Sequence, residues 1–331
     1  MKNLYKFAKE NRILEYTTLG VMIHKKCNAS CEICCTESNV QCKEKLDIDL
    51  TKKFIYSTKN NRKLSTISFT GGEPFLELDI LKNLISFTSN INKNPTCITN
   101  GFWASDYDFT YDTLKELKCL GLRQLSISYD NYHKEFVDAQ NIINVLRVAR
   151  TLNMPVFLGI IKTSGEKTGH LIDELGDDIL NAYIQVAPCY PTGRAKKIFN
   201  EKDFIRNMGV EKLLCPYNGY MSVSYDGKIY PCCSQFALGT ELYIGTYIDY
   251  DYIKVLDRIK KNGILYILRN FGFDSFANIA KNKLNIKIPD LVTSPCELCS
   301  IFFNKDTIHK FIPYVNEMIT KHTQELQYSI T

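Results

Sequence analysis

Long apolar runs are absent from this chain of 331 residues, and their absence argues against a membrane helix. A helix that spans a bilayer needs roughly 18 uninterrupted apolar residues, and no stretch reaches that length. The first residues, MKNLYKFAKENRILEY, also lack the apolar segment and the small-residue cleavage site of a signal peptide. We therefore expect no membrane partner and a cytoplasmic location.

Runs of one charge sign, internal repeats and low-complexity segments are missing too. The net charge of +5 is spread along the chain, so no nucleic-acid partner is expected. Hydrophobic residues make up 45% and charged residues 23%, which is a globular composition rather than a disordered one. The length suits one large domain with a smaller appendage.

Cysteine is what the chain has in excess. In a reducing cytosol its 13 cysteines favour metal or redox chemistry over disulfides. Eight of them fall in two groups: Cys27, Cys31 and Cys34, then Cys215, Cys232, Cys233, Cys296 and Cys299. The scattered single cysteines are expected to be small buried side chains: Cys42, Cys97, Cys119 and Cys189.

Short apolar runs alternate with helical patterns between residues 20 and 195. The predicted strands are 20–24, 65–70, 96–99, 124–130, 154–161 and 182–188. The predicted helices are 50–60, 80–90, 113–121, 141–153 and 170–180. This alternation predicts an α/β fold with a parallel sheet. The span of about 175 residues is short of the roughly 250 of a closed eight-stranded barrel, so a partial barrel or an open sheet is expected.

The alternation stops after residue 200. Residues 221–233 predict a hairpin that turns at Tyr225-Asp226-Gly227. One helix near 251–270 is expected next, and the chain closes with a helix interrupted by Pro313.

The first cysteine group occupies the loop after the first predicted strand, with the spacing Cys27-x3-Cys31-x2-Cys34. In parallel α/β folds, reactive groups gather at the carboxyl ends of strands. Three thiolates can hold three irons of a cubane cluster and leave the fourth iron open. Zinc is the alternative, with His24 or Cys35 as a fourth ligand, and spacing alone leaves the two metals level.

A glycine pair ends the second predicted strand, in the order Gly71-Gly72-Glu73-Pro74. Paired glycines allow backbone to approach a ligand closely, and the glutamate adds a charge beside it. The motif lies one strand away from the cysteine loop, at the same end of the sheet.

Together these residues resemble the radical S-adenosylmethionine (radical SAM) superfamily, whose mark is C-x3-C-x-φ-C. Ile33 occupies the φ place as an aliphatic residue, where the superfamily often has an aromatic one. The resemblance covers about residues 18–196 and implies a partial (β/α)6 barrel core at 18–200, preceded by an extension at 1–17. It implies that Cys27, Cys31 and Cys34 hold a [4Fe–4S] cluster, with Cys35 to spare.

The resemblance also implies the cofactor contacts and the reaction. The residues it assigns to S-adenosylmethionine are Ile33, Gly71, Gly72, Glu73, Pro74, Thr99, Asn100, Ser126, Ser128 and Asp130. Reductive cleavage of that cofactor would give a 5′-deoxyadenosyl radical, which abstracts a hydrogen from the substrate. A flavodoxin or ferredoxin-type protein would donate the electron.

The second cysteine group reads Cys215-x11-Gly227-x4-Cys232, followed much later by Cys296-x2-Cys299. As bare spacing it could be a zinc ribbon. Beside a radical SAM core it resembles the extension called SPASM, or Twitch in its shorter form. The Twitch form implies a region at 201–304, before a terminal helix at 305–331, with one auxiliary [4Fe–4S] cluster held by Cys215, Cys232, Cys296 and Cys299. Whether Cys232 or its neighbour Cys233 is the ligand stays open.

No catalytic acid or base stands out. The candidates are Tyr129, Asp130, His133 and Arg194. Each also has an ordinary explanation, such as a ribose contact for Asp130, a solvated loop histidine for His133 and a surface arginine for Arg194.

Three functions follow from these observations. The leading one is maturation of a ribosomally made peptide, by oxidative cross-linking or a related modification. The second is a small-molecule dehydrogenase or oxidoreductase of natural-product biosynthesis, and the third is a zinc-stabilised binding module without enzymatic activity. Residues 1–19 are too few for a leader-recognition domain, so a peptide substrate would require a separate recognition protein or the barrel's own surface.

Overall fold

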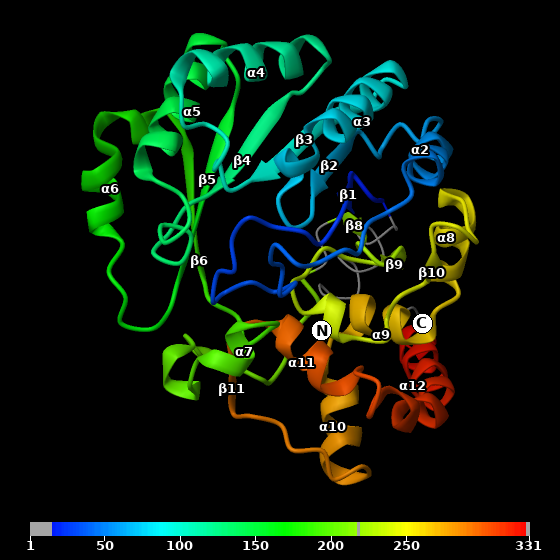
Figure 1. The fold of residues 1–331 in the computed structure, drawn as a ribbon. Helices are drawn as coiled ribbons and strands as arrows, with labels where there is room; N and C mark the ends of the chain where they lie inside the picture. Colours follow the sequence, from blue (N-terminus) through cyan, green and yellow to red (C-terminus); the bar gives the residue numbers. More distant parts are fainter. Residues whose placement is uncertain (1–14, 217–218, 329–331) are drawn as a thin grey trace.

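A curved sheet of nine strands organises the molecule (Figure 1). The structure, a computed structural model, describes residues 15–216 and 219–328. The strand order is β10-β9-β8-β1-β2-β3-β4-β5-β6. Six strands run parallel: β1 (Thr18–Met22), β2 (Thr66–Thr70), β3 (Asn94–Thr99), β4 (Gln124–Ser128), β5 (Val156–Lys162) and β6 (Tyr183–Pro188).

Helices connect these strands and cover the outside of the sheet (Figure 1). They are α2 (Ile48–Ser57), α3 (Leu78–Asn90), α4 (Tyr107–Cys119), α5 (Ala139–Thr151) and α6 (Gly169–Leu175). The predicted α/β class with a (β/α)6 unit is confirmed. Helix α4 begins six residues earlier than predicted, because the Asp106 carboxylate accepts a hydrogen bond from Phe109 N and caps the helix. The predicted helix 170–180 ends at Leu175, where Gly176 has φ +54° and a 3-10 turn follows.

The C-terminal region extends the same sheet. Strand β8 (Tyr220–Val223) pairs in parallel with β1, and β9 (Lys228–Tyr230) folds back on β8 as the predicted hairpin. A short strand, β10 (Gly245–Thr246), closes this side. The turn requires Gly227, which has φ +83° and leaves only 2.6 Å between the position of a Cβ and the Tyr247 ring.

The helices of this region differ from the predicted ones. They are α8 (Tyr252–Lys260), α9 (Gly263–Phe271), α10 (Asp274–Asn282), α11 (Pro295–Phe302) and α12 (Ile308–Tyr328). The single helix expected at 251–270 is wrong, because Asn262 caps a new helix through Leu265 N. The interruption expected at Pro313 is also wrong. Helix α12 runs through this proline, which removes only one backbone donor from a helix packed against α9 and α10.

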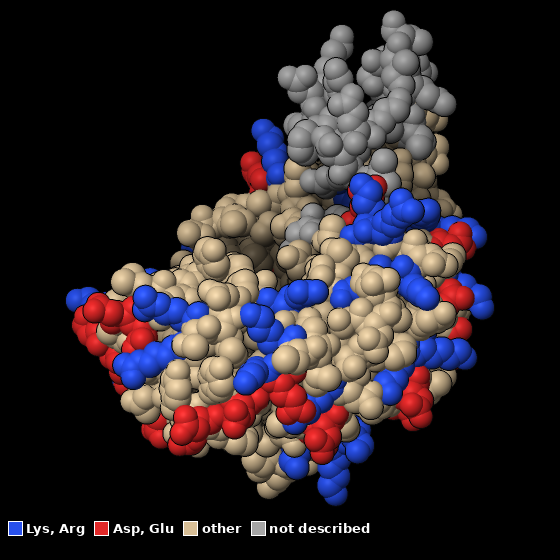
Figure 2. All heavy atoms as spheres, turned by 90° about the horizontal axis from the view of Figure 1, so that it is seen from above, with Lys and Arg blue, Asp and Glu red and all other residues tan. Residues whose placement is uncertain are grey.

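Minor elements complete the chain. They are α7 (Ala195–Ile198) and a small sheet of β7 (Met208–Gly209) and β11 (Leu291–Val292), joined by 3-10 turns at Pro74–Glu77, Gly176–Asn181, Glu201–Asp203 and Ala237–Gly239. Within the described part of the chain, no helix has the length and apolarity to cross a membrane. On the face seen in Figure 2, charged side chains of both signs are interspersed.

Candidate active site

The first cysteine group lies on a loop that leaves the carboxyl end of β1. Main-chain hydrogen bonds hold the base of this loop, from Lys25 N to Glu44 O at 2.9 Å and from Cys27 N to Asn39 O at 3.0 Å. A third bond, from Cys34 N to Cys31 O at 3.1 Å, makes the turn between these two cysteines. The protein's own main-chain contacts therefore hold the loop in this conformation.

Main-chain hydrogen-bond donors point at two of the three sulfurs. Ala29 N donates to Cys27 Sγ at 3.4 Å, and Ser38 N donates to Cys34 Sγ at 3.3 Å. Burial raises the pKa of the Cys27 thiol to about 12, and the Ala29 N–H opposes that rise. Donors of this kind stabilise negative sulfur, which is the state of a cluster ligand. The donor set therefore fits an iron–sulfur cluster.

The glycine pair is required by the cysteine loop itself. A Cβ on Gly72 would lie 2.0 Å from Lys26 O, and one on Gly71 would lie 2.3 Å from His24 O. Gly72 N donates to His24 O at 2.7 Å across this close contact. No side chain fits between two backbones this close, so the glycines fix the cysteine loop against β2.

Glu73 is buried, with its carboxylate turned into the protein. One oxygen accepts from Phe75 N at 3.0 Å and from the Thr99 hydroxyl at 2.8 Å, and the other accepts from Asn100 N at 2.7 Å. Burial raises the pKa of Glu73 to about 7 against these hydrogen bonds. The carboxylate ties the end of β2 to the end of β3, so it presents Thr99 and Asn100 to the site.

Arg194 braces the cysteine loop from the other side. Its guanidinium donates to Cys31 O at 2.5 Å and to Ser38 O at 2.8 Å, while its main-chain N donates to Cys34 O at 3.0 Å. Gly193 precedes it with φ +51°, and a Cβ there would lie 2.4 Å from Cys34 O. The side chain thus contacts loop carbonyls rather than open space.

A cavity of about 470 Å³, here called the N-terminal cysteine cavity, opens inside the curve of the sheet. Eleven predicted site residues line it: Cys27, Cys31, Ile33, Cys34, Gly71, Gly72, Thr99, Asn100, Ser126, Ser128 and His133. Five further residues predicted for this site are outside its lining: Glu73, Pro74, Tyr129, Asp130 and Arg194. Among the described residues that line it there is no Asp, Glu, Lys or Arg.

Asp130 does not line the cavity itself, but it positions His133, which does. Its buried carboxylate accepts from Ile161 N at 3.1 Å and from His133 N at 3.1 Å, and it binds His133 Nδ1 at 2.8 Å. Burial opposes a charged imidazole, but the bond to Asp130 raises the pKa of His133 to about 10. Tyr129 is buried away from the cavity beside Glu174.

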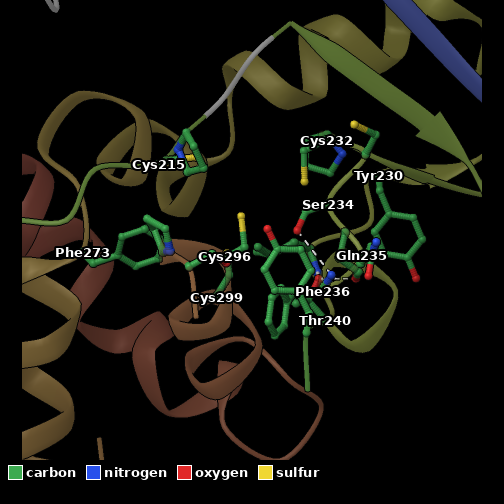
Figure 3. A pocket seen from close by; sticks show the side chains of 18 residues that line it. Cys215, Tyr230, Cys232, Ser234, Gln235, Phe236, Thr240, Phe273, Cys296 and Cys299 are labelled. Atoms are coloured by element: carbon green, nitrogen blue, oxygen red, sulfur yellow. Dashed lines mark hydrogen bonds between the residues drawn. The ribbon is translucent and has the colours of Figure 1, made fainter. Parts of the chain in front are cut away.

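The second cysteine group surrounds a separate cavity of about 390 Å³, here called the C-terminal cysteine cavity (Figure 3). Its cysteines come from three segments: Cys215, then Cys232 and Cys233 after the hairpin, then Cys296 and Cys299 on α11. Apolar side chains make most of the remaining wall: Tyr230, Pro231, Phe236, Leu242 and Phe273.

Cys232 and Cys233 are placed differently. Burial raises the pKa of Cys232 to about 12, with added repulsion from Cys215, Cys296 and Cys233. Burial also raises the pKa of Cys299, with repulsion from Cys215, Cys232 and Cys296 but not from Cys233. Cys233 is exposed, and Cys296 is the one thiol that adds to its raised pKa. Four thiols therefore face one another, and Cys233 lies at their margin.

Among residues 15–216 and 219–328, no group of three or more His, Cys, Asp or Glu side chains is arranged so that it could hold a single metal ion.

Sequence reasoning missed the wall between the two cavities. Tyr190 and Gln235 line both of them, Tyr190 two residues after the end of β6 and Gln235 three residues after Cys232. Cys189, predicted only as a buried side chain, also lines the N-terminal cysteine cavity, as does Gln185. Their positions just after a strand end and just after a ligand cysteine were the available signals. Of the other single cysteines, Cys97 is buried, Cys42 is half-buried and Cys119 is exposed, so burial was wrong for Cys119.

Known proteins resemble this chain in sequence and in fold. The Radical SAM superfamily matches residues 21–173. YydG of Bacillus subtilis (strain 168), whose name assigns it to peptide biosynthesis, is 31% identical over 309 residues, which cover 91% of this chain and 96% of YydG.

Two solved structures share the fold. One is anSMEcpe with bound AdoMet and the Cp18Cys peptide, at TM-score 0.54 and 14% identity, covering 92% of this chain and 99% of that one. The other is Streptococcus suis SuiB bound to precursor peptide SuiA, at TM-score 0.53 and 16% identity, covering 80% of this chain and 69% of that one.

Proposed function

The chain belongs to the radical SAM superfamily, and from this premise we propose that it modifies a ribosomally made peptide by abstracting hydrogen from an unactivated carbon. It is an enzyme that uses S-adenosylmethionine and a [4Fe–4S] cluster, so the zinc-stabilised binding module is set aside. Together these two groups supply a 5′-deoxyadenosyl radical. The protein's part is to hold them, orient the substrate and exclude water.

Different residues around the N-terminal cysteine cavity would bind the cluster, bind S-adenosylmethionine and position the binding residues. Cys27, Cys31 and Cys34 would hold the cluster, on a loop braced by the glycine pair and by Arg194. The polar ends of β3 and β4 would bind S-adenosylmethionine: Thr99, Asn100, Ser126 and Ser128. Glu73 would act indirectly, because its carboxylate is already used to position Thr99 and Asn100.

The observation that carries the peptide proposal is a cavity lining whose described residues include no Asp, Glu, Lys or Arg, and whose charged His133 is already paired with Asp130. A small polar substrate needs charged or strongly polar side chains that converge on it. Here Arg194 and Asp130 are engaged by the protein, and His133 is held by Asp130. The lining suits a peptide instead, since it combines the amides of Gln185 and Gln235 with the apolar side chains of Phe157 and Ile161. The name of YydG points the same way.

The C-terminal cysteine cavity supports the oxidative part of the proposal. Cys215, Cys232, Cys296 and Cys299 would hold an auxiliary [4Fe–4S] cluster, within a region at 201–304. After the first hydrogen leaves as 5′-deoxyadenosine, the carbon radical would lose one electron toward this site and one proton to solvent as a new bond forms. Tyr190 and Gln235 stand between the two cavities, where that substrate carbon would lie. A flavodoxin or ferredoxin-type donor and a separate leader-recognition protein are the proposed partners.

The test uses every short peptide encoded beside the gene, synthesised and incubated with the reconstituted enzyme, S-adenosylmethionine and dithionite. Peptides deuterated at candidate carbons should transfer deuterium to 5′-deoxyadenosine, and the product should be lighter by two hydrogen atoms. The variant that lacks Cys27, Cys31 and Cys34 is the control. A product of unchanged mass that has taken up solvent deuterium would overturn the oxidation and keep the abstraction. No transfer from any peptide, with transfer from a small alcohol, would overturn the peptide proposal.

A further inference from the structure

We propose that the open edge of β6 is the docking edge for the peptide substrate, which pairs with it as an extended added strand. This inference rests on the proposed function and names the surface that recognises the substrate. The docking edge comprises Tyr183–Pro188, the six residues of β6.

The edge is free along its length. Strand β6 ends the sheet order and pairs with β5 from Phe157–Tyr183 to Lys162–Pro188. In the described sheet no strand lies on its other side. Strand β1 is different, because β8 covers its outer edge. An uncovered edge presents a row of backbone N–H and C=O groups that can pair with another chain.

Its side chains are uncovered on both faces, which is unusual for a strand in a parallel sheet. Tyr183 is 66% exposed, Ile184 is 44% exposed and Val186 is 54% exposed. Proteins commonly protect such edges with charged side chains, yet residues 179–193 contain none. An apolar, uncharged edge left open in this way fits a partner strand of similar character.

The edge leads directly into the reaction site. Gln185, from the middle of β6, lines the N-terminal cysteine cavity. Tyr183 stacks on Phe157 of the same cavity, with ring centroids 5.1 Å apart. Beyond Pro188, Cys189 and Tyr190 continue the cavity wall. A peptide that pairs with β6 would therefore extend toward the space between the two cysteine sites.

This continuity identifies the occupant as the substrate peptide rather than a second copy of the chain. Added-strand recognition takes its affinity from main-chain hydrogen bonds and its selectivity from alternate side chains. It would explain how an enzyme whose described cavity lining has no Asp, Glu, Lys or Arg holds a polypeptide. A second copy would have no need for an edge that ends inside the active site.

The test compares Ile184→Lys/Val186→Lys with Ile253→Lys, a control on α8 where the native side chain is 70% exposed. The probe is the precursor peptide identified by the deuterium-transfer experiment, and all preparations are matched for iron content. Lysines on the edge should weaken peptide binding about tenfold or more, because they disfavour an added strand. The control should bind like the wild type. Hydrogen–deuterium exchange should show the amides of 183–188 becoming protected when the peptide is added.

The outcomes separate this inference from the proposed function. If no peptide is turned over, both are overturned. If the peptide is turned over, but the edge variant binds it normally and 183–188 gain no protection, the docking edge alone is overturned. If light scattering shows a wild-type dimer that the edge variant dissociates, and the peptide protects nothing, the edge belongs to a second copy and the inference is again overturned.

Discussion

The two cysteine sites are built in opposite ways. In the first, three thiols come from one short loop, and main-chain donors and close glycine contacts hold that loop. In the second, four thiols come from three segments spread over residues 215–299, inside a largely apolar wall. The first has polar side chains beside its cysteines at the ends of β3 and β4. In the proposed assignment, the first site has three protein ligands and polar neighbours, which suits chemistry on a bound cofactor, and the second has four thiolate ligands, which suits electron transfer.

Of the changes considered, removing the three cysteines of the first site should have the largest effect on iron content and on cleavage of S-adenosylmethionine. The reconstituted wild type should hold about eight irons, the sum of two cubanes, and the Cys27→Ala/Cys31→Ala/Cys34→Ala variant should hold about four. That variant should lose all cleavage of S-adenosylmethionine under dithionite, measured as 5′-deoxyadenosine. Retained cleavage would mean that the two sites have been assigned the wrong way round.

Adding a single methyl group at Gly72 should remove almost as much iron from the first site. In Gly72→Ala the added Cβ would lie 2.0 Å from the Lys26 carbonyl oxygen, and backbone at that distance has to move. We expect this variant to lose most of the iron of the first site and about 3 kcal/mol of unfolding free energy. Gly239→Ala is the matched control, since nothing lies within 4 Å of its Cβ position. Equal stability of both variants would show that the close contact does not hold the loop.

The second site can be tested with two adjacent residues. Cys232→Ala should lose about four irons, and Cys233→Ala should keep them, because Cys232 faces the other three thiols and Cys233 lies at their margin. Iron analysis and the EPR signal of the reduced auxiliary cluster measure this directly. The reverse pattern would place Cys233 in the cluster.

These sites also show what the sequence could and could not predict. The cysteine loop and the hairpin were predictable, because their spacing is local and their strands alternate at period two. Arg194 was named as a candidate catalytic residue, but its contact with the cysteine loop was not predictable, because its hydrogen bond to Cys31 joins residues 163 positions apart. Tyr190 and Gln235 were missed for the same reason, since they share a wall only when the C-terminal hairpin joins the sheet beside β1. The local sequence pattern predicts the helices and strands, whereas packing between elements far apart in the chain decides which side chains face the site.

Replacing Glu73 should show that residues other than the cluster ligands also stabilise the first site. Glu73→Ala leaves Asn100 N and the Thr99 hydroxyl without their buried acceptor, which should lower the unfolding free energy by about 2–3 kcal/mol. Glu116→Ala is the control, because it breaks an exposed ion pair with Lys82 worth about 1 kcal/mol at most. Chemical denaturation of both variants measures the difference. Equal losses would indicate that the carboxylate is not a structural tie, and would return it to direct contact with S-adenosylmethionine.

Arg194→Lys should give the smallest effect and the finest test of how the loop is braced. Lysine keeps the charge, but its single ammonium cannot reproduce the two-pronged contact with Cys31 O and Ser38 O. The main-chain bond from residue 194 to Cys34 O does not depend on the side chain. We therefore expect normal iron content and a loss of about 1 kcal/mol in unfolding free energy, accompanied by a changed EPR signal of the first cluster and an unchanged signal of the second. If the signal of the second cluster changes instead, the guanidinium acts across the wall at Tyr190, and the two sites are less independent than their construction suggests.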